Sequence, residues 1–188
     1  MILNVNNITE EDLATRVRWI NDPRVNQYMY FIFPVNSETT AEWFNRVNAA
    51  ADRQDLVFKD EDGQPVGMAG LTAINPHFSN TEFYIFIDPD LQGKGIGKAI
   101  TSWMLDYAFS VLKVYKVYLY TDGDNLPGIR MYENLGFVKE GHQRRHRLKN
   151  GKFHDKLIYG IFNDEWKKHR KRKDCRHTVT ARRFASVV

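Results

Sequence analysis

The sequence predicts one domain of the α/β (α+β) class, and three observations support this. The chain has 188 residues, of which 43% are hydrophobic and 13% aromatic. That is enough for one well-buried core and too little for two. Amphipathic helical segments alternate with strands along the chain, which places helices and a sheet around a common core. No internal repeat and no long low-complexity linker divides the sequence.

The first fifty residues predict two helices. Thr9 is a candidate N-cap for the first, which is expected to end near Asp22-Pro23, because a residue before proline avoids the helical conformation. The second is expected to begin after Ser37. Apolar residues recur at helical spacing in both segments, namely Leu13, Val17 and Ile20, and then Trp43, Phe44 and Val47.

The remainder predicts a sheet with two further helices. β-Branched and aromatic runs predict strands at 56–59, 65–72, 81–88, 114–120 and most of 137–162. Asn150-Gly151 is a strong hairpin signal within the last of these. Apolar residues at i, i+3, i+4 and i+7 make 97–112 the clearest helix, and 128–135 is a short one.

The net charge of +4 comes from the end of the chain. From Trp166 onward there are nine Lys or Arg residues and one acid, which leaves 18 basic and 22 acidic residues in 1–165. We therefore expect a domain at 1–166 and a basic tail at 167–188, disordered and solvated as charge runs usually are. Contact with nucleic acid or the ribosome, or a part in a homo-oligomer, are alternatives for the tail. The acidic body favours a cationic substrate.

Several classes of protein are disfavoured. No apolar run approaches the length needed to cross a bilayer, and the N-terminus lacks the features of a secretory signal, so a cytoplasmic protein is expected. The single cysteine, Cys175, excludes an intrachain disulfide. The six histidines lack metal-ligand spacing, and we expect no metal.

One segment predicts a phosphate-binding turn between a strand and the clearest helix. Its glycines let a phosphate approach the backbone, the free amides of the first helical turn point toward it, and two lysines add charge. The P-loop and the dinucleotide fingerprint do not match this spacing. The candidate residues are Gln92, Gly93, Lys94, Gly95, Ile96, Gly97 and Lys98.

This turn resembles the acetyl-CoA signature of the GCN5-related N-acetyltransferases (the GNAT family), in the pattern Gln92-x-x-Gly95-x-Gly97. The segment from Asn125 to Tyr132 and on to Gly136-Phe137 resembles the second signature of that family. The resemblance covers most of 1–165. It implies a mixed, mostly antiparallel central sheet flanked by helices, and direct acetyl transfer from acetyl-CoA to an amine in a ternary complex.

The resemblance also implies roles for individual residues. Tyr132 matches the tyrosine that protonates the departing thiolate, although a buried tyrosine on a short helix is also an ordinary core residue. Glu82 is a candidate general base or amine anchor, unless it lies on a solvent-facing strand position. Asn125 is expected to contact the pantetheine arm or to cap its helix. The backbones of Phe86 and Ile87 are expected to bind the pantetheine amides.

The acceptor is expected to be a small molecule with a primary amine. The stretch 18–23 resembles the branch that contains spermidine, ribosomal-protein N-terminal and amino-sugar acetyltransferases, and 105–119 is closest to its polyamine members. A polyamine or other small cationic amine is therefore favoured over an aminoglycoside or a protein N-terminus. A non-catalytic CoA-binding module and a nucleic-acid-binding protein are the competing classes. An aromatic cluster either lines the substrate pocket or packs internally, and it consists of Tyr28, Tyr30, Phe31 and Phe33.

Overall fold

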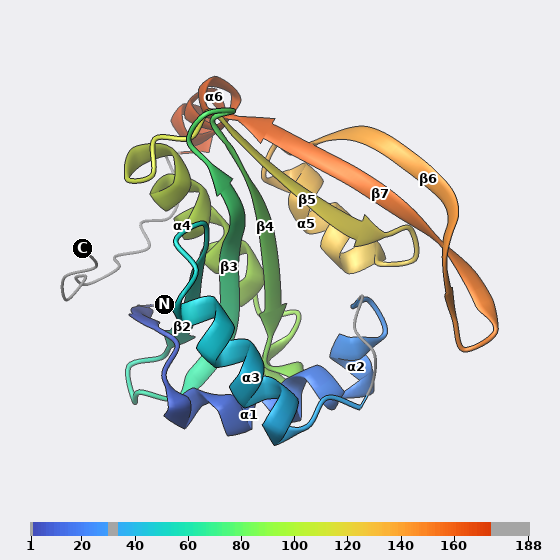
Figure 1. Ribbon diagram of the computed structural model, residues 1–188. Coiled ribbons are helices and arrows are strands. Elements are labelled where there is room, and N and C mark those ends of the chain that lie inside the picture. Colours follow the sequence, from blue (N-terminus) through green and yellow to red (C-terminus); the bar gives the residue numbers. More distant parts are fainter. Residues whose placement is uncertain (1, 30–33, 174–188) are drawn as a thin grey trace.

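A single seven-stranded sheet organises the molecule, in the order β1-β2-β3-β4-β5-β7-β6 (Figure 1). The computed structural model describes residues 2–29 and 34–173. Only the β4–β5 pair is parallel, which confirms a mixed, mostly antiparallel sheet. The strands are β1 (Asn4–Asn7), β2 (Gln54–Lys59), β3 (Pro65–Asn75), β4 (Asn80–Ile87), β5 (Lys116–Asp122), β6 (Val138–Lys149) and β7 (Lys152–Phe162).

Helices cover both faces of this sheet. Figure 1 shows α1 and α3 on one face and α4 on the other. Among the described residues, no helix is both long and apolar enough to cross a membrane. The α-helices are α1 (Leu13–Asn21), α2 (Pro23–Asn26), α3 (Ser37–Asn48), α4 (Ile96–Ser110), α5 (Leu126–Asn134) and α6 (Asn163–Lys173), with short 3-10 turns η1 (Glu10–Asp12) and η2 (Pro89–Leu91).

The expected starts and ends of the first helices are confirmed with small shifts. The Thr9 amide donates to Asp12 Oδ2 at 3.0 Å in a capping box, and a 3-10 turn precedes α1. The α1 helix ends one residue before Asp22, as the following proline requires. The cap of α3 is Asn36, whose Oδ1 accepts from the Thr39 amide at 2.8 Å, so this helix already includes Ser37.

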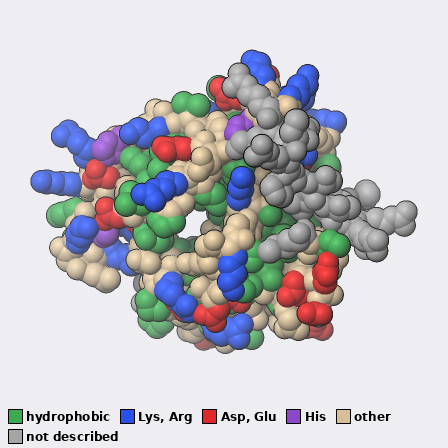
Figure 2. Space-filling model, turned by 180° about the vertical axis from the view of Figure 1, so that it is seen from behind, with side chains coloured by type: hydrophobic (Ala, Val, Ile, Leu, Met, Phe, Trp, Pro, Cys, Tyr) green, Lys and Arg blue, Asp and Glu red, His purple; other side chains and the backbone are tan. Residues whose placement is uncertain are grey.

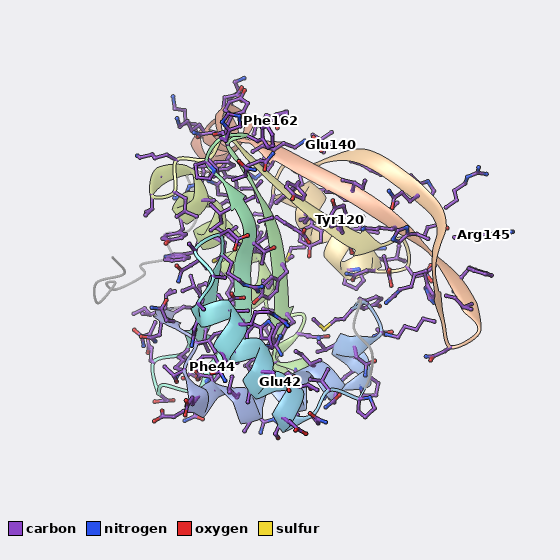
Figure 3. The ribbon with its side chains drawn as sticks, viewed as in Figure 1. Glu42, Phe44, Tyr120, Glu140, Arg145 and Phe162 are labelled. Atoms are coloured by element: carbon purple, nitrogen blue, oxygen red, sulfur yellow. The ribbon has the colours of Figure 1, made fainter. Side chains whose placement is uncertain are left out.

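Strand alternation divides the core into two clusters. Phe83 packs into the cluster beneath α4, where Ile100 and Met104 are fully buried. Phe86 packs into the opposite cluster with Trp19 and Phe44, beneath α1 and α3. Figure 3 shows Phe44 and Glu42 on the same helix, and only the first of these is buried. The sheet is therefore covered on both faces, and ligands must enter at an edge or a gap.

Such a gap opens between β4 and β5. Their pairing covers only three positions, from Asn80 opposite Lys116 to Glu82 opposite Tyr118. Beyond Glu82 the two strands are no longer paired, whereas β4 stays bonded to β3 as far as Ile87. The second half of β4 therefore presents one edge without a neighbouring strand.

The β6–β7 hairpin extends from the body beyond β5 (Figure 1). Its turn is the predicted Asn150-Gly151, and both residues have a positive φ. Arg145 lies on the outer part of the hairpin, where basic side chains gather in the space-filling view (Figures 2 and 3). Arg147 fixes the hairpin to the segment after α2, because its guanidinium donates to the Met29 carbonyl and to Asp122.

The expected boundary between body and tail, at residue 166, falls inside α6. Residues 167–173, which the sequence assigned to the tail, continue this helix. Trp166, only 3% exposed, donates from Nε1 to Asp106 Oδ1 at 2.8 Å, and Arg170 forms an ion pair with the same carboxylate at 3.2 Å. Cys175 and the rest of 174–188 lie outside the described residues.

Candidate active site

A cleft of about 1320 Å³ occupies the gap between β4 and β5. Its walls come from α1, α3 and the segment after α2 on one side, and from the start of α4 and from α5 on the other. The space-filling view shows an opening between these two parts of the molecule (Figure 2). The cleft is larger than a typical small-molecule pocket, and residues from both faces of β4 line it.

The predicted phosphate-binding turn lies at one end of this cleft. Gly93 and Gly95 have φ values of +75° and +82°, a conformation that strains other residues, and a Cβ at either would meet no atom within 4 Å. The α4 helix begins at Ile96, and its first intrahelical bond runs from the Ala99 amide to the Gly95 carbonyl at 3.1 Å. The preceding amides have no partner in the helix, so the turn suits an anionic group.

The third glycine of the turn has a different role. Gly97 is inside α4, and a Cβ there would lie 3.1 Å from Met131 Sδ on α5. This glycine therefore permits close packing of α4 against α5 and does not itself form the turn. Of the other residues predicted to bind the phosphate, some line the cleft and some do not. Gln92 and Lys98 line the cleft, whereas Lys94 is exposed outside its walls and the Ile96 side chain is buried in the core.

The backbone of β4 supplies free groups at Ile87 but not at Phe86. The Asp88 amide donates to the Val66 carbonyl of the β3 side at 3.1 Å. Since hydrogen-bonding direction alternates along an antiparallel pair, Phe86 is also bonded to β3. Ile85 and Ile87 face the other way, where β5 has diverged. Both line the cleft, so the free backbone groups at this edge belong to Ile85 and Ile87 and not to Phe86.

Asn125 is the N-cap of α5 and lines the cleft, as expected. Its Oδ1 accepts from the Gly128 amide at 3.1 Å, and its Nδ2 donates to Thr121 Oγ1 at 3.0 Å. A Cβ at Gly128 would lie 2.5 Å from Asn125 Nδ2. The glycine therefore makes room for this side chain.

Tyr132 lies on the same side of the cleft and is only 7% exposed. Its ring packs edge-on against Phe137, with centroids 5.7 Å apart. Burial raises the pKa of Tyr132 well above its usual value, so the phenol stays protonated at neutral pH. The neighbouring Tyr159 donates to Glu133 Oε1 at 2.8 Å, whereas the Tyr132 hydroxyl forms no hydrogen bond to the residues that the structure describes.

Glu82 lies at the last position of β4 that pairs with β5, is half-buried and lines the cleft. Its side chain is therefore not at a fully exposed strand position. Burial raises the pKa of Glu82, and the charge of Lys156 partly opposes this. The Lys156 ammonium lies 3.7 Å from the ring centroid of Tyr120, whose own pKa is raised by burial and by Glu82.

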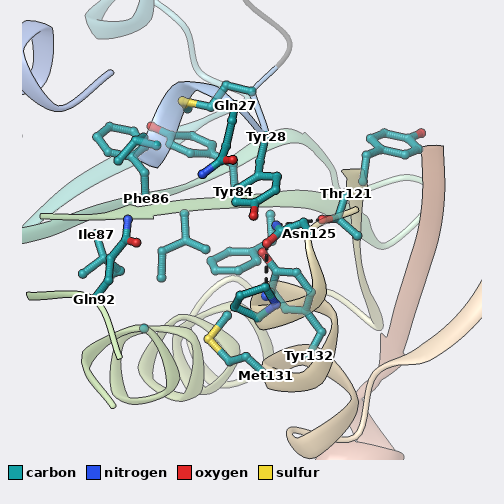
Figure 4. Close-up of a pocket in the computed structure, with 18 of the residues that line it drawn as sticks. Gln27, Tyr28, Tyr84, Phe86, Ile87, Gln92, Thr121, Asn125, Met131 and Tyr132 are labelled. Carbon is teal, nitrogen blue, oxygen red and sulfur yellow. Dashed lines mark hydrogen bonds between the residues drawn. The ribbon is translucent and has the colours of Figure 1, made fainter. Parts of the chain in front are cut away.

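The segment after α2 faces the catalytic candidates across the cleft. In Figure 4, Gln27 and Tyr28 lie on the side opposite Tyr132, with Asn125 between them. Tyr28 thus lines the cleft, which is one of the two alternatives for the aromatic cluster. Tyr30, Phe31 and Phe33 lie outside the described residues.

Sequence reasoning missed many of the side chains that line the cleft, among them Arg16, Tyr120 and Lys156. These three come from α1, β5 and β7. Strict alternation in residues 114–120 could have placed Tyr120 on the face opposite Leu119, but no local pattern marks Arg16 or Lys156.

Within residues 2–29 and 34–173, no group of three or more His, Cys, Asp or Glu side chains is placed to hold a metal.

Comparisons with known proteins agree with this geometry. The family model described as the acetyltransferase (GNAT) domain matches residues 3–138. The spermidine N(1)-acetyltransferase of Vibrio cholerae is 32% identical over 138 residues, which cover 72% of this chain and 79% of that relative. A putative ribosomal N-acetyltransferase of Bacillus subtilis is 30% identical over 105 residues, which cover 56% of this chain and 57% of the relative.

Solved structures give the same result. The crystal structure of the Vibrio cholerae spermidine N-acetyltransferase with CoA and spermine superposes with a TM-score of 0.82 at 27% identity. The match covers 87% of this chain and 97% of that one. The family model spans both sequence signatures, which are the turn before α4 and the α5 segment. It also spans β4 and β5, the two strands that diverge to open the cleft. The chain therefore belongs to the GNAT family of acetyltransferases.

Proposed function

We propose that this protein transfers an acetyl group from acetyl-CoA to the primary amine of a polyamine or another small cationic amine. One observation carries the proposal. A single cleft unites an anion-binding helix start, a strand edge with free backbone groups, and two titratable side chains, Glu82 and Tyr132. Neither a CoA-binding module without activity nor a nucleic-acid-binding protein requires the last two.

The donor half of the cleft fits the parts of acetyl-CoA in order. The α4 turn at Gly93 and Gly95 would hold the pyrophosphate by its amides and by the helix dipole. The free backbone groups of Ile85 and Ile87 would bond the pantetheine amides as a further strand would. Asn125, already fixed by two hydrogen bonds, lines the same path.

Transfer needs a neutral amine and a protonated leaving group. A primary amine has a pKa of about 10.4, so a base must remove a proton before attack. Glu82 is positioned for this, and its raised pKa makes it a stronger base than an exposed carboxylate. The amine nitrogen then forms the C–N bond to the thioester carbonyl carbon and the C–S bond breaks. Tyr132, protonated through neutral pH, gives its proton to the departing sulfur, and the surplus proton on the newly bonded nitrogen restores the phenol.

Polyamines are the first acceptors to test, because the Vibrio cholerae relatives are spermidine acetyltransferases and one was solved with spermine. The purified chain should be incubated with acetyl-CoA and spermidine, spermine, an aminoglycoside or a peptide with a free N-terminus, while thiol release is followed. We expect release with at least one polyamine, and none in the Tyr132→Phe, Glu82→Gln double variant. Thiol release with the peptide alone would move the function to the protein N-terminus. If none of the amines supports thiol release, the proposal is overturned.

A further inference from the structure

The part of the cleft between α1, α3 and β2 contains arginine side chains that the acetylation of an amine does not require. Arg16 on α1 is only 5% exposed and lines this part of the cleft. Its Nε is buried without a hydrogen-bond partner, and the guanidinium forms no ion pair with any described residue. Leaving a buried cation without a partner is strongly destabilising in proteins. Such a group calls for a ligand.

The Arg16 guanidinium is held in a fixed orientation. Its Cζ lies 3.6 Å from the ring centroid of Trp43 and 6.0 Å from that of Phe86. Stacking on an aromatic face leaves the in-plane N–H donors of an arginine available at its edge. Burial also lowers the pKa of Arg16, as expected for a cation that lacks a full set of partners.

Two more arginines surround the same tryptophan. Arg53 Cζ is 5.9 Å from the Trp43 ring, and Arg46 lies three residues beyond Trp43 on α3, on the same helical face. Both line the cleft. The neighbouring carboxylate, Asp55, is already engaged, because Arg53 donates to its two oxygens at 2.6 and 2.8 Å. The Tyr84 hydroxyl also donates to Asp55.

The charges of this pocket therefore do not cancel. Asp55 offsets one of the three guanidinium groups and leaves two. Over the whole cleft, seven Lys or Arg side chains and one acid, Glu82, are found among the described residues that line it. Lys98 and Arg130 lie with α4 and α5, on the side of the cleft opposite α1 and α3. An excess of arginines with planar donor edges is suited to an oxyanion.

We infer that an oxyanion, a carboxylate or a phosphate, binds between Arg16, Arg46 and Arg53 on the side of the cleft formed by α1 and α3, opposite the turn before α4. Two sources have this chemistry. The acceptor can carry an anionic group beside its amine, or a separate small anion can occupy the pocket next to the acceptor. The binding site itself does not depend on which amine is acetylated, so its test needs no turnover.

The test is calorimetric titration of the full chain with inorganic phosphate at constant ionic strength. Saturating CoA is present throughout, which blocks the phosphate sites of the donor. The wild-type chain should show one saturable site. Two variants test the site: Arg16→Met, which keeps the packing on Trp43, and Arg46→Gln, at an exposed position. Each should weaken the affinity for phosphate about 10-fold or more, as expected for a lost charge-assisted hydrogen bond. The matched control is Arg18→Gln, an exposed position of α1 outside the cleft, which should leave the affinity within about twofold.

Absence of saturable phosphate binding in the wild-type chain would overturn the inference, and so would equal affinity in the wild-type chain and the Arg16→Met and Arg46→Gln variants. The source is then separated with the matched amines putrescine and ornithine, which differ by one carboxylate. If the acceptor supplies the anion, kcat/KM favours ornithine, Arg46→Gln removes that preference, and phosphate competes with ornithine. If the anion is separate, Arg46→Gln changes both amines equally and phosphate competes with neither.

Discussion

Replacing Gly95 by alanine tests the donor site most directly. Its φ of +82° lies in the left-handed region, where a residue with a Cβ is destabilised by about 1–2 kcal/mol. For a chain of this size each kcal/mol lowers Tm by about 2–4 °C, so Gly95→Ala should lose about 2–8 °C. The added Cβ meets no protein atom within 4 Å, and the strain is therefore the whole structural effect.

The chain offers a matched control for that strain. Gly63, in the turn between β2 and β3, has a φ of +77°, and a Cβ there also meets nothing within 4 Å. Gly63→Ala should lose the same 2–8 °C without affecting the ligand. In Gly95→Ala the Cβ lies beside the first amides of α4, so CoA should lose a charge-assisted hydrogen bond worth about 1.5–3 kcal/mol.

The assay is calorimetric titration with CoA, which needs no acceptor. A loss of 1.5–3 kcal/mol corresponds to a Kd about 10- to 100-fold higher than that of the wild-type chain. Gly63→Ala should bind CoA like the wild type. If the two variants lose equal Tm and bind CoA equally well, the turn before α4 does not hold the pyrophosphate, and the donor assignment is refuted.

Three further predictions follow from the site and its support. Tyr132→Phe should lower kcat by about 100-fold or more with an unchanged Kd for CoA, and an unchanged kcat would exclude it as the acid. Burial raises the pKa of Glu82 and Lys156 lowers it, so kcat should fall as pH drops through that raised pKa. Lys156→Met should move this acid limb to higher pH, and a shift to lower pH would contradict the assignment. Trp166→Phe removes the bond to Asp106 and should reduce the free energy of unfolding by about 1.5–3 kcal/mol in urea; an unchanged midpoint would show that the bond adds nothing.

Local patterns in the sequence predicted most elements of the fold. The Thr9 cap, the helix before Pro23 and the Asn150-Gly151 turn depend on interactions within a few residues, and the structure has all three. The family and the α4 turn were also predictable, because a glycine with positive φ next to a helix start is a local feature. The expected boundary at residue 166 falls within α6, because a charge run resembles a tail and does not show that a helix continues through it.

The sequence by itself therefore determined the fold class, the family, the glycine turn before α4 and the position of Tyr132 on a short helix. The tertiary structure alone decided which backbone groups of β4 are free, because hydrogen-bonding direction depends on register with β3 and on the divergence of β5. It also brought Glu82 and Lys156 together from strands 74 positions apart, and enclosed Arg16 without a partner. The electrostatic interactions of a side chain depend on its distances in space to other charges, and these distances cannot be read from positions along the chain.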